Sequence, residues 1–181
     1  MGPFGVADLA GGDIGYAGRK RRAAADPNYR QLPIADKLGE MGRLGQKTGA
    51  GWFKYEKGDR TPHPAPEVER VIAETRRELG INARAISDEE ILRRILFSSV
   101  NEACKILQEG IAARAGDVDV MWLYGFGFPR YRGGLMHWAD QIGPKAIHEQ
   151  MRAWEKTYGA RWKPAKLLKD LAEAGKSFAE T

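Results

Sequence analysis

The spacing of apolar residues predicts a chain built almost entirely of helices. The strongest pattern begins at Ser87, which forms a capping box with Glu90 at the first turn of a helix. Apolar residues then recur at intervals of three and four, as they do along one face of an amphipathic helix that ends near Gly110; these are Ile91, Leu92, Ile95, Leu96, Val100, Ala103, Cys104, Leu107 and Ile111. Strand-like alternation is almost absent, so the predicted fold class is all-α.

Shorter helices are predicted on both sides of this one, separated by glycine and proline. They lie near residues 3–16, 34–41, 66–79, 117–122, 144–158 and 164–174. Residues 56–66 contain three alternate prolines, which favour an extended linker and therefore a boundary between two subdomains. The expected organisation is a first domain at residues 1–60, a linker and helix at 61–86, and a second domain at 87–181.

The chain contains an internal repeat with an offset of 132 residues. A glycine turn followed by a short helix with an Ala-Asp-x-x-Gly ending occurs at residues 1–11 and again at 133–143. The identical pairs are Gly2 and Gly134, Ala7 and Ala139, Asp8 and Asp140, and Gly11 and Gly143. The second copy has a long helix and the segment around Asp117 ahead of its turn. The first copy begins at the turn, so we expect it to be truncated at its N-terminal side.

Composition narrows the class of protein. With 43% hydrophobic and 29% charged residues, the chain reads as an ordinary globular protein. No apolar run is long enough to span a membrane, and the N-terminus does not resemble a secretory signal. Cys104 is the single cysteine, so an internal disulfide is impossible and a cytoplasmic location is expected.

The net charge of +5 raises the question of an anionic partner. The one dense basic run, at residues 19–22, is interpreted first as a solvated surface and second as a site for an anion such as the nucleotide end of coenzyme A. Zinc-ligand spacings and RNA-binding aromatic motifs are missing, so nucleic acid is not expected as a partner.

Nucleotide-binding turns are not evident in the sequence. Residues 45–49 suggest a phosphate loop, but Gln46 stands where that loop requires glycine before Lys47, and no apolar strand precedes the segment. A G-x-G-x-x-G turn after a strand is also missing, because the glycines near residue 125 are interrupted by Pro129.

Candidate catalytic and metal-binding side chains each have a simpler interpretation. His63 and His148 are expected at the surface, and His137 is expected to pack. The three histidines do not have the spacing of metal ligands. Cys104 lies on the apolar stripe and is expected in the core. Asn101 is expected to be exposed or bonded locally, although a polar residue on this helix also permits a functional role.

Several motifs, taken together, resemble the C-terminal region of 3-hydroxyacyl-CoA dehydrogenases. Residues 1–15 resemble the MGPF-x-x-x-D-x-x-G-x-D-x-G signature that opens the family's C-terminal domain. Residues 42–55 resemble the G-R-x-G-Q-K-T-G-x-G segment that closes it. The second C-terminal domain of multifunctional fatty-acid oxidation proteins is matched by residues 100–103, 109–112, 117–119 and 124–134. Each motif alone is modest, but together, in the family's order, they make a specific match.

The resemblance implies a role in oxidising the 3-hydroxyl of an acyl-CoA with NAD in fatty-acid β-oxidation. The family's catalytic histidine–glutamate pair lies on the nucleotide-binding domain, and a substrate-holding asparagine lies just before the MGPF turn. Both would fall upstream of this chain, and Asn101 matches only the second repeat's counterpart of that asparagine. No catalytic, cofactor-binding or metal-binding residue is therefore assigned, and substrate contact is expected of Met1, Gly2, Pro3 and Phe4.

The resemblance also implies partners. The expected partners are the N-terminal nucleotide-binding half of the enzyme, an acyl-CoA substrate and, as one possibility, a second copy of the chain. NAD is expected in the complete enzyme but not on this chain alone. The two repeats are expected to pack as a pseudo-dimer, with the helix that begins near residue 87 at its centre. The alternative is a non-catalytic helical module for interaction or dimerisation.

Overall fold

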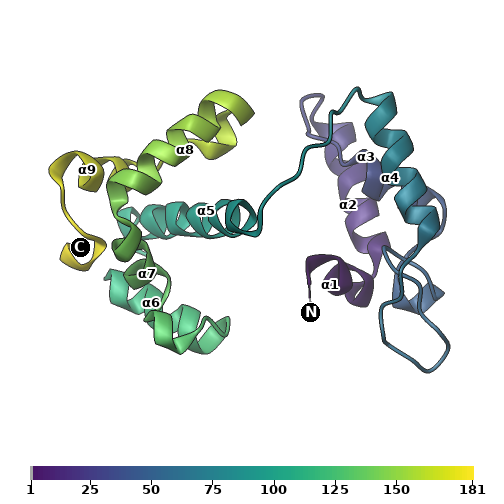
Figure 1. Ribbon diagram of the computed structural model, residues 1–181, viewed down its shortest axis with the longest axis horizontal. Helices are drawn as coiled ribbons and strands as arrows, with labels where there is room; N and C mark the ends of the chain where they lie inside the picture. Colours follow the sequence, from purple (N-terminus) through teal and green to yellow (C-terminus); the bar gives the residue numbers. More distant parts are fainter. Residues whose placement is uncertain (1) are drawn as a thin grey trace. The chain divides into compact units, whose positions relative to one another are not determined.

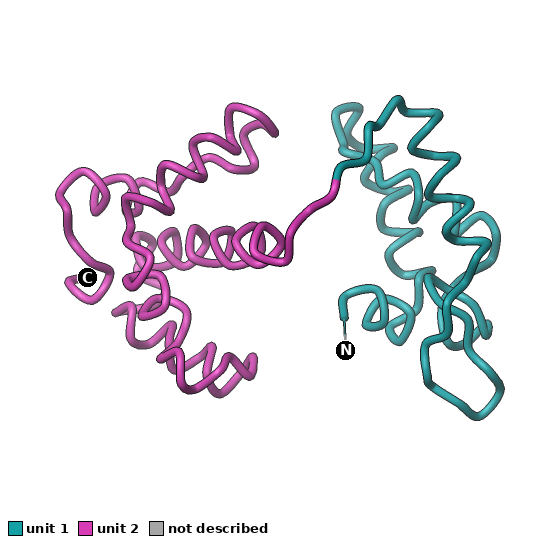
Figure 2. Tube along the Cα trace, in the orientation of Figure 1, with its two compact units in different colours: residues 1–84 teal, residues 85–181 magenta. Residues whose placement is uncertain are grey.

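The computed structural model describes residues 2–181 and divides the chain into two compact units, Met1–Arg84 and Ala85–Thr181 (Figure 2). Within the described residues there are nine α-helices, and the only β-structure consists of isolated bridges in one loop of the first unit (Figure 1). The predicted all-α fold class is confirmed. The packing of the two repeats as a pseudo-dimer stays a prediction.

The first unit is a small helical body with a long loop between its third and fourth α-helices. Its elements are α1 (Pro3–Ala10), α2 (Gly12–Ala25), α3 (Pro33–Glu40), the short 3-10 helix η1 (Gln46–Thr48) and α4 (Pro66–Glu78). Three of the helices begin with proline, whose missing N–H costs nothing in the first turn. A small core is formed by Leu38 of α3, Val68 of α4 and Ala65 just before α4, and Trp52 and Ile72 pack against it.

The boundary between the units lies after Arg84 rather than in the proline-rich segment at residues 56–66. That segment is extended, as predicted, but it is fastened to the first unit, because the backbones of Lys54 and His63 exchange two hydrogen bonds of 2.9 and 3.0 Å. The helix that follows it packs on α3 through Val68. The connection between the units is instead formed by residues 81–87, which have no regular secondary structure.

The second unit is larger and has the more extensive core. It contains α5 (Asp88–Gln108), α6 (Ala115–Gly125), η2 (Arg130–Arg132), α7 (Leu135–Ile142), α8 (Pro144–Tyr158), η3 (Ala160–Trp162), α9 (Lys166–Ala174) and η4 (Phe178–Glu180). In Figure 1, α5 runs through the middle of this unit. It contributes Phe97, Val100 and Cys104 to a core shared with α7, α8 and α9.

At the start of α5, the predicted cap by Ser87 is present. The Ser87 side chain accepts a hydrogen bond of 3.2 Å from the Glu90 amide, and Arg94 one turn later donates to the Glu90 carboxylate. The start of α6 differs from the prediction. This helix begins at Ala115, before the expected start near residue 117, and its N-cap is Arg114. Asp117 is its third residue and accepts a hydrogen bond from the Arg114 amide.

Candidate functional site

The candidate site lies at α1, where the two motifs of the first unit meet around one buried carboxylate. Asp8 is 3% exposed, and its two oxygens accept hydrogen bonds from the amides of Trp52 and Phe53, at 2.9 and 3.0 Å. The Tyr55 hydroxyl donates a third bond of 3.0 Å. Burial, aided by Asp8, raises the pKa of Tyr55 to about 12. We call these four residues the Asp8 anchor.

Two glycines of the closing motif permit this close approach. Gly45 has a φ of +100°, and a Cβ placed on it would lie 2.2 Å from the Asp8 carbonyl oxygen. A Cβ on Gly51 would lie 2.0 Å from the Asp8 carboxylate. Side chains at these positions would therefore separate the loop from α1. Gly45, which belongs to the segment that suggested a phosphate loop, thus serves packing of the backbone against a helix.

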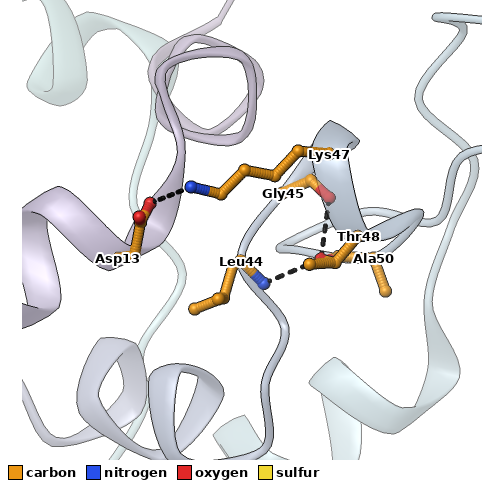
Figure 3. Close-up of polar contacts among 6 residues, drawn as sticks. All are labelled: Asp13, Leu44, Gly45, Lys47, Thr48 and Ala50. Atoms are coloured by element: carbon orange, nitrogen blue, oxygen red, sulfur yellow. Dashed lines mark hydrogen bonds and ion pairs between the residues drawn. The ribbon is translucent and has the colours of Figure 1, made fainter.

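The lysine and threonine of the same motif also bond within the first unit (Figure 3). Lys47 Nζ lies 2.5 Å from an Asp13 carboxylate oxygen, and this contact lowers the pKa of Asp13. The Thr48 hydroxyl accepts from the Leu44 amide at 3.1 Å and lies within hydrogen-bond distance of the carbonyls of Gly45 and Ala50. The segment is thus a folded turn that joins η1 to α2.

The residues predicted to contact substrate lie at the start of α1. Met1 is outside the described residues, whereas Gly2 and Pro3 are exposed. Phe4 is half exposed, and its ring lies against that of Trp52 with 4.4 Å between the centroids. The Asp8 anchor therefore holds both the helix and the aromatic partner of Phe4. Substrate contact by these residues stays a prediction.

In the second repeat, an aspartate at the equivalent position also binds backbone amides that are distant in sequence. Asp140 of α7, the counterpart of Asp8, accepts from the amides of Phe178 and Ala179 at 2.6 and 3.0 Å. The glycines that end the two short helices also have similar conformations, with φ of 98° at Gly11 and 93° at Gly143. The Ala-Asp-x-x-Gly pattern predicted the helix and its glycine. The anchoring role of the aspartate was missed because its partners are distant in sequence.

Asn101 differs from its prediction. It is buried, and its side chain accepts from the Ala165 amide at 2.7 Å and donates to the Lys163 carbonyl at 3.1 Å. The interpretation as an exposed or locally bonded residue was wrong, because α5 runs beside the segment that leads into α9. Asn101 holds that segment from both sides of Pro164.

The remaining candidates are structural or exposed. Cys104 is fully buried, and burial raises its pKa to about 12, so its thiol is suited to packing and not to nucleophilic attack. His137 was expected to pack but is exposed, with a ring nitrogen 3.2 Å from the Gln141 amide. In the part of the chain that the structure describes, acidic, histidine and cysteine side chains do not form a group suited to a metal ion.

The described residues do not fit a dinucleotide. NAD-binding folds place pyrophosphate on a glycine turn between a parallel strand and a helix. From residue 2 onward the only β-structure consists of bridges between Gly45, Ala50, Lys54 and His63. None of the helices formed by these residues is long and apolar enough to cross a bilayer.

Comparison with known proteins identifies the class. The model of the family "3-hydroxyacyl-CoA dehydrogenase, C-terminal domain" matches residues 1–55 and again residues 91–181. The chain therefore belongs to this family. Each match contains one copy of the repeat, and together the matches contain the motifs that carried the resemblance.

Curated relatives extend beyond the region that is shared. The chain is 40% identical over 190 residues to the peroxisomal bifunctional enzyme of Homo sapiens, covering 97% of this chain and 26% of that protein. It is 41% identical over 179 residues to a peroxisomal fatty acid beta-oxidation multifunctional protein of Oryza sativa subsp. japonica, covering 96% of this chain and 24% of the relative. The chain thus spans about a quarter of the length of these relatives.

Solved structures agree on the fold. The dehydrogenase part of multifunctional enzyme 1 from C. elegans matches with a TM-score of 0.67 and 25% identity, over 94% of this chain and 38% of that one. A 3-hydroxybutyryl-CoA dehydrogenase from Escherichia coli matches with a TM-score of 0.61 at 19% identity, which supports the fold alone.

The expected cytoplasmic location is contradicted by these relatives. Those of human and rice are named as peroxisomal, and one from Cucumis sativus as glyoxysomal. The expectation rested on the single cysteine. It failed because the lack of a disulfide does not distinguish the cytoplasm from other compartments where thiols stay reduced.

Proposed function

We propose that this chain is the C-terminal, helical part of an NAD-dependent 3-hydroxyacyl-CoA dehydrogenase of fatty-acid β-oxidation. The observation that carries the proposal is the double match to the dehydrogenase C-terminal domain, at residues 1–55 and 91–181. The names of the relatives, which are fatty-acid β-oxidation and bifunctional enzymes, support the pathway. Their names also support a peroxisomal location.

The proposed division of labour follows from what the described residues contain. NAD and the base that removes the hydroxyl proton would belong to an N-terminal nucleotide-binding half, because the helices described here do not fit a dinucleotide. This chain would supply a surface that positions the acyl-CoA. Placing a substrate beside a separate catalytic group is itself a large part of catalysis.

Residues 2–4 are the proposed point of substrate contact. The Asp8 anchor fixes the helix on which they lie, and Trp52 supports one face of the Phe4 ring. A half-exposed aromatic ring beside an exposed glycine and proline offers an apolar surface to an acyl chain or a thioester. The role of the anchor would be to hold this surface rigid.

Titration calorimetry tests this division. The chain alone is expected to give no heat with NAD, whereas a complex with the nucleotide-binding half is expected to bind NAD and then a 3-hydroxyacyl-CoA. Binding of NAD by the isolated chain would contradict the proposal. If the complex forms and binds NAD but never 3-hydroxyacyl-CoA, the alternative of a non-catalytic interaction module is favoured instead.

A further inference from the structure

Charge is distributed unevenly along α6 and the turn that follows it in the second unit. Between Asp119 and Asp140 the sequence contains no acidic residue, although 29% of the whole chain is charged. The same stretch contains Arg130, Arg132 and six aromatic residues. The two flanking carboxylates accept hydrogen bonds from backbone amides of their own unit. The stretch is therefore positively charged and rich in aromatic rings.

Much of this stretch is exposed apolar surface at the lower edge of the second unit in Figure 1. The exposed fraction is 84% for Tyr131, 74% for Tyr124 and 69% for Phe126. Val120 and Met121 of α6 are also exposed, and they lie one turn before Tyr124 on the same side of the helix. Together with Arg130 and Arg132, we call these five residues the α6 surface. Exposed apolar side chains gathered in this way mark a site of interaction.

The two arginines of η2 lie on the exposed tyrosine rings. The guanidinium carbon of Arg130 is 5.4 Å from the centre of the Tyr124 ring, and that of Arg132 is 5.5 Å from the centre of the Tyr131 ring. In the part of the chain that the structure describes, neither guanidinium has a carboxylate partner. Their positive charge is thus available to an anionic partner.

The turn that carries these side chains is fixed from beneath. The Trp122 carbonyl accepts hydrogen bonds from the amides of Phe126 and Phe128, at 3.3 and 3.0 Å. Phe128 is buried, and its ring meets that of Trp122 edge-on with 5.8 Å between the centroids. Gly127, with a φ of +67°, allows the chain to reverse between the two phenylalanines. A partner would therefore find the α6 surface already folded, which lowers the entropic cost of binding.

We propose that the α6 surface binds the surface of a lipid bilayer that carries anionic headgroups. The guanidiniums of Arg130 and Arg132 would contact phosphate and carboxylate oxygens of the headgroups. The tyrosine rings would lie at the level of the headgroups, where amphipathic aromatic side chains are favoured, and Phe126 and Met121 would reach the first part of the acyl chains. The binding is peripheral, because only side chains enter the bilayer.

The composition of the α6 surface favours a bilayer over a compact ligand or a nucleic acid. A pocket for a small molecule encloses most of its ligand, whereas rings as exposed as Tyr124 and Tyr131 provide no walls. A single-stranded nucleic acid would stack on the rings and contact the arginines. It would gain little from Val120 and Met121, which have neither a charge nor a π face. A bilayer uses both kinds of side chain.

Flotation with vesicles tests the proposal without an enzymatic assay. The chain is expected to float with vesicles of phosphatidylcholine mixed with phosphatidylserine, and much less with phosphatidylcholine alone. The double substitution Arg130→Gln and Arg132→Gln is expected to weaken binding about tenfold or more, since each arginine beside an anionic surface contributes about fivefold. No flotation with the mixed vesicles, or equal flotation with both kinds, would overturn the proposal.

A matched control separates the α6 surface from net charge. Lys145→Gln and Lys156→Gln together remove the same charge from exposed positions of α8 and should leave binding nearly unchanged. An equal loss in both double variants would mean that any positive charge suffices, and would overturn the proposal. Tyr131→Ser tests the apolar part. Because the ring is exposed, this substitution should weaken binding about threefold without altering the thermal melt, and unchanged binding would contradict insertion of the ring.

Amide hydrogen exchange locates the contact on the native chain. Residues 126–132 are expected to exchange about tenfold more slowly with the mixed vesicles, whereas the basic run at residues 19–22 should be unaffected. Protection of the basic run instead would overturn the proposal. So would protection of residues 126–132 by a single-stranded oligonucleotide but not by vesicles, or protection that rises with the chain's own concentration without lipid. The partner would then be a nucleic acid or a second copy. None of these results depends on NAD or acyl-CoA, so this proposal and the proposed function can fail separately.

Discussion

At the scale of single residues, two aspartates at the repeat offset perform the same task with different numbers of partners. Asp8 receives three hydrogen bonds from residues more than forty positions away, and Asp140 receives two from the end of the chain. Each joins a short helix to a segment of its unit that lies far away in the sequence. A buried carboxylate serves this purpose well, since it accepts several bonds and each is strengthened by its charge.

Replacing Asp8 with alanine should therefore destabilise the first unit. Three donors would lose their acceptor, and each buried unsatisfied donor costs about 1–3 kcal/mol. Asp140→Ala is the matched control in the second unit and should cost less, because only two donors lose their partner. Urea unfolding monitored by hydrogen exchange in each unit measures both. A stable first unit in the Asp8→Ala chain would mean that the loop is held by other contacts.

Tyr55 gives the anchor a dependence on pH. Its pKa is raised from 10.0 to about 12, so the folded chain retains the phenol proton at a pH where the unfolded chain has released it. The stabilisation from this residue is present below pH 10 and is lost as the pH rises toward 12. The free energy of unfolding should fall over this window more steeply for the native chain than for Tyr55→Phe. Identical slopes would contradict this account.

Some residue roles could be predicted from the sequence, whereas others could be recognised only in the folded structure. The repeat, the glycine turns and the buried position of Cys104 followed from local patterns. The bonds of Asp8 and Asn101 did not, because each has partners that are distant in sequence. Periodicity reports which residues share a helix face. It does not report which loop returns to meet that face.

At the scale of elements, α5 combines a buried and an exposed apolar face. Phe97, Val100 and Cys104 are almost fully buried, whereas Ile95 is 56% exposed. The sequence pattern had predicted that these residues form one apolar stripe, because residues three or four positions apart lie on one broad side of a helix. The length of the helix and its start at residue 88 were predicted correctly, since caps and glycines are local signals.

Alanine substitutions along α5 should follow this division. Phe97 lies between Trp138 and Trp154, so Phe97→Ala should cost about 3–5 kcal/mol. Ser87→Ala removes one cap and should cost about 1 kcal/mol. Ile95→Ala should cost less than Phe97→Ala, because that side chain is largely exposed. Denaturant melts of the second unit give the order, and a larger loss at Ile95 than at Phe97 would show that another surface covers it.

At the scale of the whole molecule, the chain consists of two copies of one helical domain, and only the second contains its own α5–α6 pair within the described residues. The class of protein could be predicted from the motifs and their order along the chain. The cellular location could not be predicted, because amino-acid composition does not specify a compartment. The packing of residues 56–66 against the first unit could not be predicted either, because prolines indicate an extended segment and not whether that segment packs.

We propose that this chain belongs to a dehydrogenase and is not active by itself. This proposal is tested most directly by following NADH formation from NAD and a 3-hydroxyacyl-CoA, first with the chain alone and then with the nucleotide-binding half added. The account predicts a rate equal to that without protein for the chain alone, and a rate that rises with added chain once the other half is present. Turnover by the chain alone, or a rate with the other half that the chain does not change, would contradict it.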